Sequence, residues 1–115
     1  MIKNKQLIGK TVNVLGELYT IYLANENDPK VEDANAYVEL LTHEIYLLDT
    51  LFDEDKRKMC NFDRYINKVV RHELIHAVFN ESGLHGYCVD EDLVDFLAWQ
   101  LPKIFKMCKG LNVES

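Results

Sequence analysis

Residues 72–76 contain two histidines and a glutamate at a spacing that is typical of metal-dependent hydrolases. The segment reads His-Glu-Leu-Ile-His, an HExxH pattern. In an α-helix, residues four apart project from nearly the same side because one turn takes about 3.6 residues. His72 and His76 can therefore reach a single metal ion, and Glu73 projects beside them without having to be a ligand. Two imidazoles and a carboxylate base are what a zinc hydrolase requires, so the pattern predicts a zinc site.

The helix that must position these side chains is predicted over residues 61–80. Asn61 is a good N-cap residue, apolar residues recur at helical spacing through the segment, and Gly83 suits the position just after a helix. A last helix is predicted to start near Asp90, its N-cap, and to run past Trp99. Pro102 should kink or end it, with residues 103–109 forming a short continuation.

A catalytic zinc ion usually has three protein ligands and one water, so one more ligand must come from elsewhere in the chain. Glu91 is the favoured candidate. Glu91 and Asp95 are four residues apart on the last predicted helix, so one carboxylate can bind the metal while the other accepts the free N–H of a ligating histidine. Acidic residues also stabilise helix N-termini by charge alone, but Asp95 lies a turn too far into the helix for that explanation.

Other residues remain open as the third ligand: His85, Asp90, Asp92 and Cys88. His85 is the main rival, because it lies in a glycine-flanked loop shortly after the motif. His85 and Tyr87 are also candidate donors to a developing oxyanion, a role that active sites commonly give to His or Tyr, although each could equally be an ordinary loop residue. A further alternative is that the two motif histidines lie one turn apart by chance, without a metal.

Segments rich in β-branched and aromatic residues precede the motif and predict strands at residues 11–15, 18–24, 36–41 and 43–48. Gly16-Glu17 predicts a hairpin turn between the first two. Strands followed by helices indicate an α+β fold, in which a small antiparallel sheet packs against the HExxH helix and a C-terminal helix. We expect an edge strand near the site, at residues 43–48, to bind an extended peptide by strand addition.

Length and composition exclude several classes of protein. A chain of 115 residues is expected to form one domain, residues 1–115. Its formal net charge of -6 argues against nucleic acid as a partner, and no apolar run approaches the roughly 20 residues of a membrane span. The N-terminal segment lacks the apolar core of a signal peptide, and three widely spaced cysteines fit reduced thiols better than disulfides. We therefore expect a cytoplasmic protein without a membrane partner.

The segments 71–77 and 91–98, with Pro102 after them, resemble a gluzincin arrangement in minimal form. They are similar to small metallopeptidase-like proteins of phages and prophages. They also resemble the metallopeptidase domain of the ImmA/IrrE type, where an HExxH helix is followed by a helix carrying an acidic ligand. The elongated metzincin motif would instead require a histidine at position 82, which is Ser82. The resemblance covers about residues 61–102.

The resemblance implies a zincin-like fold with His72, His76 and Glu91 as zinc ligands. It implies Glu73 as the general base and Asp95 as the hydrogen-bond partner of a ligand. We therefore expect a zinc metallopeptidase that hydrolyses a peptide bond in a protein or peptide, in the cytoplasm of a bacterial host if it is phage-encoded. The alternative is a non-catalytic, zinc-stabilised phage structural or regulatory domain. An intact Glu73 favours the enzyme, whereas the small size of the chain favours the alternative.

Overall fold

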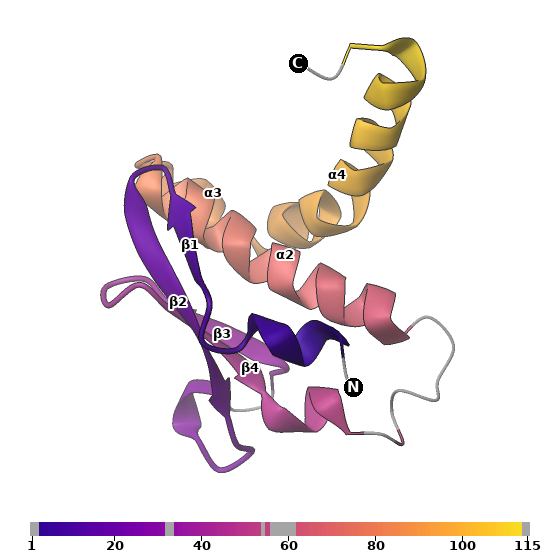
Figure 1. The fold of residues 1–115 in the computed structure, drawn as a ribbon. Coiled ribbons are helices and arrows are strands. Elements are labelled where there is room, and N and C mark those ends of the chain that lie inside the picture. The colour runs from indigo at the N-terminus through magenta and orange to yellow at the C-terminus, as the bar shows by residue number, and fades with distance from the viewer. Residues whose placement is uncertain (1–2, 32–33, 54, 56–61, 114–115) are drawn as a thin grey trace.

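The computed structural model describes residues 3–31, 34–53, 55 and 62–113 and has the expected α+β architecture. Four strands form one sheet: β1 (Thr11–Val14), β2 (Glu17–Ala24), β3 (Ala36–Glu39) and β4 (Glu44–Leu48). Helices α2 (Phe62–Glu81), α3 (His85–Cys88) and α4 (Glu91–Leu111) follow. Short 3₁₀ segments are η1 (Lys3–Leu7), η2 (Pro29–Val31) and η3 (Asp49–Phe52). Helix α2 lies across the sheet, and α4 crosses α2 on its other side (Figure 1).

The sheet is mixed, so the prediction of a purely antiparallel sheet was wrong. Its order is β1-β2-β4-β3; β1–β2 and β3–β4 are antiparallel, but β2 and β4 run parallel. After β2 the chain first forms the edge strand β3 and then turns back to insert β4 into the middle. Ile45 and Leu47 of β4 are fully buried, which explains why this strand takes the central place. Residues 43–48 are therefore not an edge, and β3 is.

The hairpin between β1 and β2 turns one residue earlier than predicted. Leu15 and Gly16 form a two-residue loop, and both have positive φ, 51° and 101°. Positive φ at both loop residues matches the right-handed twist of the strands, and glycine adopts it at little cost. The side chain of Asn13 also accepts a hydrogen bond from the Gly16 N–H at 2.7 Å.

Helix α2 is shared by two hydrophobic clusters. Toward the sheet, Val69, Val70 and Ala77 join the buried residues of β1, β2, β3 and β4. Toward α4, Ile75 packs with Val94 and Ala98. With both of these faces covered, the remaining side of α2, which carries the HExxH residues, is held in a fixed orientation.

The predicted end of α2 at Gly83 and the predicted N-cap of α4 at Asp90 agree with the structure, and Asn61 lies outside the described residues. Gly83, with φ 76°, follows α2, where the Gly83 and Leu84 N–H groups donate to the carbonyls of Asn80 and Phe79. This is a Schellman motif, which glycine favours. The Asp90 side chain accepts a hydrogen bond from the Leu93 N–H at 3.1 Å and caps α4.

Helix α4 continues through Pro102 to Leu111, so the proline does not end it and the predicted continuation over residues 103–109 belongs to the same helix. Proline has no N–H, so the carbonyl of Ala98, four residues earlier, loses its usual helical donor. The Nε of Arg71 on α2 donates to this carbonyl at 2.9 Å. Arg71 thus compensates for the proline and ties α4 to α2.

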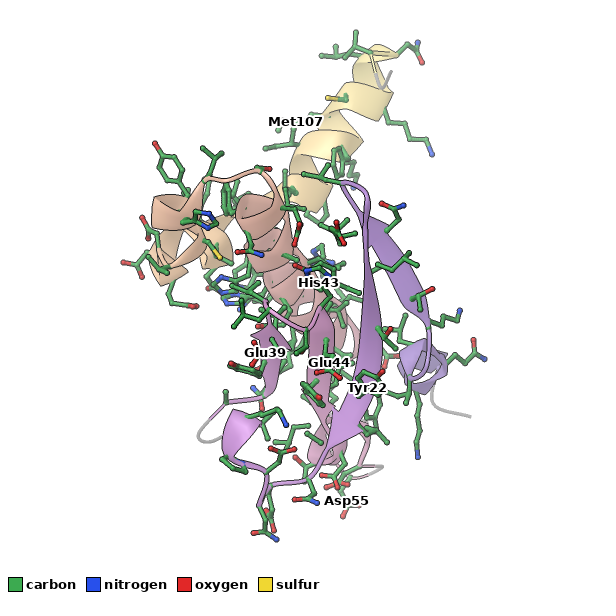
Figure 2. All side chains as sticks on the ribbon, turned by 90° about the vertical axis from the view of Figure 1, so that its left-hand side faces the viewer. Tyr22, Glu39, His43, Glu44, Asp55 and Met107 are labelled. Carbon is green, nitrogen blue, oxygen red and sulfur yellow. The ribbon has the colours of Figure 1, made fainter. Side chains whose placement is uncertain are left out.

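The C-terminal part of α4 extends beyond the rest of the molecule (Figure 1). Met107, labelled in Figure 2, lies on this part and is 61% exposed, and Phe105 and Leu111 are also exposed. Among the helices of the described residues, none combines the length and the apolar character needed to cross a bilayer.

Candidate metal centre

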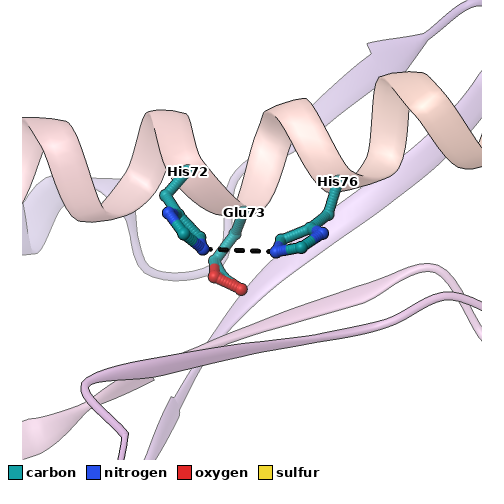
Figure 3. A group of neighbouring side chains, drawn as sticks. All are labelled: His72, Glu73 and His76. Atoms are coloured by element: carbon teal, nitrogen blue, oxygen red, sulfur yellow. Dashed lines mark hydrogen bonds between the residues drawn. The ribbon is translucent and has the colours of Figure 1, made fainter. Parts of the chain in front are cut away.

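The motif residues His72, Glu73 and His76 project from the same side of α2, with Glu73 between the two imidazoles (Figure 3). Their candidate ligand atoms lie within 4.8 Å of one another. The Nε2 atoms of His72 and His76 are 3.2 Å apart. Glu73 and His76 are buried, whereas His72 is half-buried at the rim. The predicted helical spacing therefore does bring the three side chains together.

Glu91, the favoured third ligand, reaches this group from the first turn of α4. One carboxylate oxygen lies 2.9 Å from His72 Nε2, and the other lies 3.0 Å from His76 Nε2. Glu73, which belongs to the group of three above, is the more deeply buried carboxylate, whereas Glu91 is the one that contacts both Nε2 atoms. Glu91 itself is 68% exposed, so it forms the solvent side of the site.

The hydrogen-bond partner of His76 Nδ1 defines which nitrogen of that ring carries a proton. His76 Nδ1 lies 2.6 Å from the Cys88 carbonyl, which can only accept, so this nitrogen is the donor. His72 lies between two carboxylates, with Nδ1 3.2 Å from Asp95 and Nε2 2.9 Å from Glu91, so either nitrogen can donate. When Nδ1 carries the proton in both neutral rings, both Nε2 atoms present lone pairs to each other and to the Glu91 oxygens.

This convergence of acceptors fits a metal cation. The Nε2 atoms of His72 and His76 and the two carboxylate oxygens of Glu91 face one another. When both imidazole rings are neutral with the proton on Nδ1, none of these four atoms is a hydrogen-bond donor. One charged ring at His72 would supply a single donor to Glu91, so these contacts are compatible with a metal without requiring one. Tetrahedral zinc with ligand bonds of about 2.0–2.1 Å places its ligand atoms about 3.3 Å apart, close to the spacing found. The residues present therefore fit zinc.

Asp95 takes the supporting position that the sequence predicts for it. Besides accepting from His72, it forms an ion pair with Lys68, whose ammonium group also lies 5.1 Å from the centre of the Trp99 ring. The hydrogen bond from Lys68 lowers the pKa of Asp95 despite partial burial, so the carboxylate stays ionised. An ionised partner fixes the ring of His72 and increases its basicity as a ligand.

The carboxyl group of Glu73 is tuned toward proton transfer near neutral pH. Burial and, to a smaller extent, the nearby charge of Glu91 raise its pKa, and Lys68 opposes the shift; the pKa that results is about 8. A general base is most effective when its pKa is close to the working pH. The environment of Glu73 thus differs sharply from that of the exposed Glu91.

A hollow of about 550 Å³ opens beside the histidines. Its walls come from the edge strand β3, from α2 and from the segment that joins α3 to α4: Ala36, Tyr37, Val38, Leu40, His72, Glu73, His76, Cys88, Val89 and Glu91, with Ala34 at its margin. The hollow therefore lies between the candidate metal ligands and the free edge of the sheet.

The alternative ligands have other environments. Asp90 caps α4, Asp92 is exposed, and the Cys88 thiol donates to the His76 carbonyl at 3.2 Å. His85 and Tyr87 lie on α3, are exposed, and are not among the residues that line the hollow. Their role as oxyanion donors stays a prediction that no contact supports.

Sequence reasoning missed two contributors to the site. Lys68, which holds Asp95, lies four residues before His72 and shares its side of the helix, so helical spacing alone could have indicated it. The backbone carbonyl of Cys88, which orients His76, had no such signal, because any residue type supplies a carbonyl.

Comparisons of this chain with protein-family models, with curated proteins and with solved structures found no match.

Proposed function

We propose that this protein is a zinc-dependent metallopeptidase of the gluzincin type, which hydrolyses a peptide bond in a protein or peptide. The observation that carries the proposal is the convergence of His72, His76 and Glu91 beside a buried Glu73. A purely structural zinc site is usually closed by four protein ligands and has no use for a buried carboxyl group beside it. Here a carboxyl group suited to proton transfer faces the hollow next to the ligands.

In this proposal His72, His76 and Glu91 hold the zinc ion, and Asp95 orients His72. Bound zinc would supply a lowered pKa for water and polarisation of the scissile carbonyl. Glu73 accepts the proton of the attacking water and delivers it to the leaving amine, acting first as base and then as acid. Because Glu73 is buried, its proton exchanges with the reacting groups in the hollow rather than with bulk solvent.

The free edge of β3 is the proposed place for an extended peptide. The Leu48 N–H donates to the Asn35 carbonyl, and hydrogen-bonded pairs alternate along an antiparallel ladder. It follows that the backbone groups of Ala36 and Val38 point away from β4, toward the hollow. A peptide added there as a further strand would pass the candidate ligands.

The proposal extends to a cytoplasmic setting, in a bacterial host if the chain is phage-encoded. Cys88 and Cys108 are both free, which suits a reducing compartment.

The first experiment is elemental analysis of protein purified without a chelating resin, for wild type, Glu91→Ala and Asp92→Ala. We expect about one zinc per wild-type chain, a marked loss in Glu91→Ala and no loss in the control Asp92→Ala, which removes a neighbouring exposed carboxylate. Wild-type protein that takes up no metal, even after zinc is added back, would refute the proposal.

A second variant separates an enzyme from a non-catalytic zinc domain. Glu73→Gln should abolish cleavage of a peptide library while it keeps zinc content and folding, because glutamine matches the neutral carboxyl group in shape. If wild-type protein holds zinc but its cleavage of the peptide library equals that of Glu73→Gln, the non-catalytic alternative is correct.

A further inference from the structure

A second hollow, away from the candidate metal ligands, lies where α4 crosses α2. It has a volume of about 230 Å³ and is lined by Arg64, Asn67 and Arg71 of α2 and by Trp99, Pro102 and Lys103 of α4. Arg64, Asn67 and Arg71 are spaced so that they share one side of α2, and Trp99 and Lys103 are one turn apart on α4. Two helices therefore contribute three cationic side chains to one small concavity.

Within the part of the chain that the structure describes, the cationic side chains of this hollow have no carboxylate paired with them. No carboxylate is among its lining residues, and within the described residues Arg64, Arg71 and Lys103 take part in no ion pair. This is unusual in a chain that has 19 acidic residues against 13 basic ones. Burial, together with the neighbouring charge of Arg64, lowers the pKa of Arg71, so the two guanidinium groups repel each other.

The position of Arg71 is fixed by the backbone. Its Nε donates to the Ala98 carbonyl that Pro102 leaves without a helical donor. The two terminal N–H₂ groups of Arg71 are not used in that bond. A guanidinium that is held at Nε and has its outer nitrogens available offers the paired donors that suit a tetrahedral oxyanion.

We propose that this hollow is a binding site for a phosphate group, either free phosphate or the phosphate of a small phosphomonoester. A phosphomonoester carries about −1.5 to −2 charges at neutral pH and several acceptor oxygens, which matches three converging cations better than a single carboxylate does. Trp99 adds an aromatic wall for the group that carries the phosphate. The overall negative charge opposes binding only weakly, because salt screens charges beyond roughly 8–10 Å.

Trp99 is the only tryptophan of the chain, so its fluorescence reports on this hollow directly. The experiment titrates the protein as purified with inorganic phosphate and with phenyl phosphate, using chloride at equal ionic strength and acetate as control anions. We expect a saturable change in Trp99 fluorescence with phosphate. Phenyl phosphate should bind more tightly than phosphate if the natural ligand is an ester, and equally tightly if the natural ligand is the free ion. Acetate that binds as tightly as phosphate would overturn the proposal.

Matched variants locate the binding. Lys103→Gln and Arg64→Gln should each weaken phosphate binding about tenfold or more, the usual effect of losing one charge-assisted hydrogen bond. Lys109→Gln removes the same charge from the same helix outside the hollow and should leave affinity within about twofold. Circular dichroism checks that each variant is folded.

Phosphate could also bind at a metal ion, and the variants distinguish this case. Binding that survives Lys103→Gln and Arg64→Gln but disappears after zinc is removed would place phosphate at the metal centre and refute the proposal. Binding that survives zinc removal and falls in both variants supports it, whether or not the protein cleaves peptides.

Discussion

At the scale of single residues, the candidate site depends on hydrogen bonds that orient each ring. The Cys88 carbonyl accepts from His76 Nδ1 and the Asp95 carboxylate lies 3.2 Å from His72 Nδ1, so both Nε2 atoms face the Glu91 carboxylate. Lys68 in turn keeps Asp95 ionised and in place. Metal affinity should therefore depend on residues that never touch the metal.

Asp95→Ala tests this dependence. The variant leaves His72 without its partner, so zinc affinity should fall roughly 10- to 100-fold, the usual effect of removing such a partner. Competition with a fluorescent zinc chelator measures the affinity. Asp92→Ala, an exposed carboxylate on the same helix, is the control, and equal affinities in the two variants would show that Asp95 plays no such part.

A second residue-scale prediction concerns pH and Tyr19. Its hydroxyl donates to Glu81 at 2.5 Å, and burial, followed by that hydrogen bond, raises its pKa to about 12. An unfolded tyrosine titrates near 10, so between about pH 10 and 12 the folded state binds more protons and stability falls as pH rises. The contribution of Tyr19 is fully present below about pH 10.

Urea unfolding at several pH values between 8 and 11.5 measures this effect. Tyr19→Phe should be less stable than wild type at pH 8 but should lose less stability on going to high pH. Tyr87→Phe, which changes an exposed tyrosine, should follow the wild-type curve. Parallel curves for wild type and Tyr19→Phe would contradict the assigned shift.

At the scale of elements, three pieces of structure build the candidate site: α2 supplies two candidate ligands and the candidate base, α4 supplies the third candidate ligand, and β3 supplies the opposite wall. The insertion of β4 between β2 and β3 is what leaves β3 as the free edge beside the hollow. Substrate binding in the proposed enzyme should therefore depend on backbone groups of β3.

Ala36→Pro removes an outward-pointing N–H of β3 without removing a bond to β4. We expect peptide cleavage to fall at least about tenfold, with zinc content and far-ultraviolet circular dichroism unchanged. Thr11→Pro makes the same change on β1, the opposite edge of the sheet, and should leave cleavage intact. Undiminished cleavage by folded Ala36→Pro would exclude strand addition at this edge.

At the scale of the whole molecule, the protein is less compact than its length requires. Its radius of gyration is 14.8 Å, against about 13 Å for a compact chain of this length. The projecting end of α4 accounts for the excess (Figure 1). Stability should accordingly come from the layers around α2 and hardly at all from the end of α4.

Two matched leucine substitutions test this distribution. Leu47 is fully buried between the sheet and α2, so Leu47→Ala should lower the free energy of unfolding by about 2–5 kcal/mol. Leu111 is 74% exposed at the end of α4, so Leu111→Ala should change the free energy of unfolding by no more than about 0.5 kcal/mol. Urea unfolding measures the free energy of unfolding of both variants. A large loss of stability in Leu111→Ala would mean that the end of α4 has a partner in solution.

Local patterns in the sequence determined the elements and most of the candidate site. Helical spacing alone places His72, Glu73 and His76 on one side of α2, and the same rule pairs Glu91 with Asp95 on α4. Caps and turns such as Gly83 and Asp90 are equally local, because their bonds join residues a few positions apart. These features follow from short-range geometry and can therefore be predicted from the sequence.

Only the tertiary structure decided how these pieces meet. Three contacts join residues that are far apart in the chain. They are the parallel pairing of β2 with β4, the hydrogen bond from Arg71 to the Ala98 carbonyl, and the hydrogen bond from His76 to the Cys88 carbonyl. Strand order and backbone contacts leave no side-chain pattern, since every residue except proline carries the same N–H and C=O groups. The spacing of acceptors around the candidate metal position and the cationic hollow at the helix crossing therefore became visible only in three dimensions.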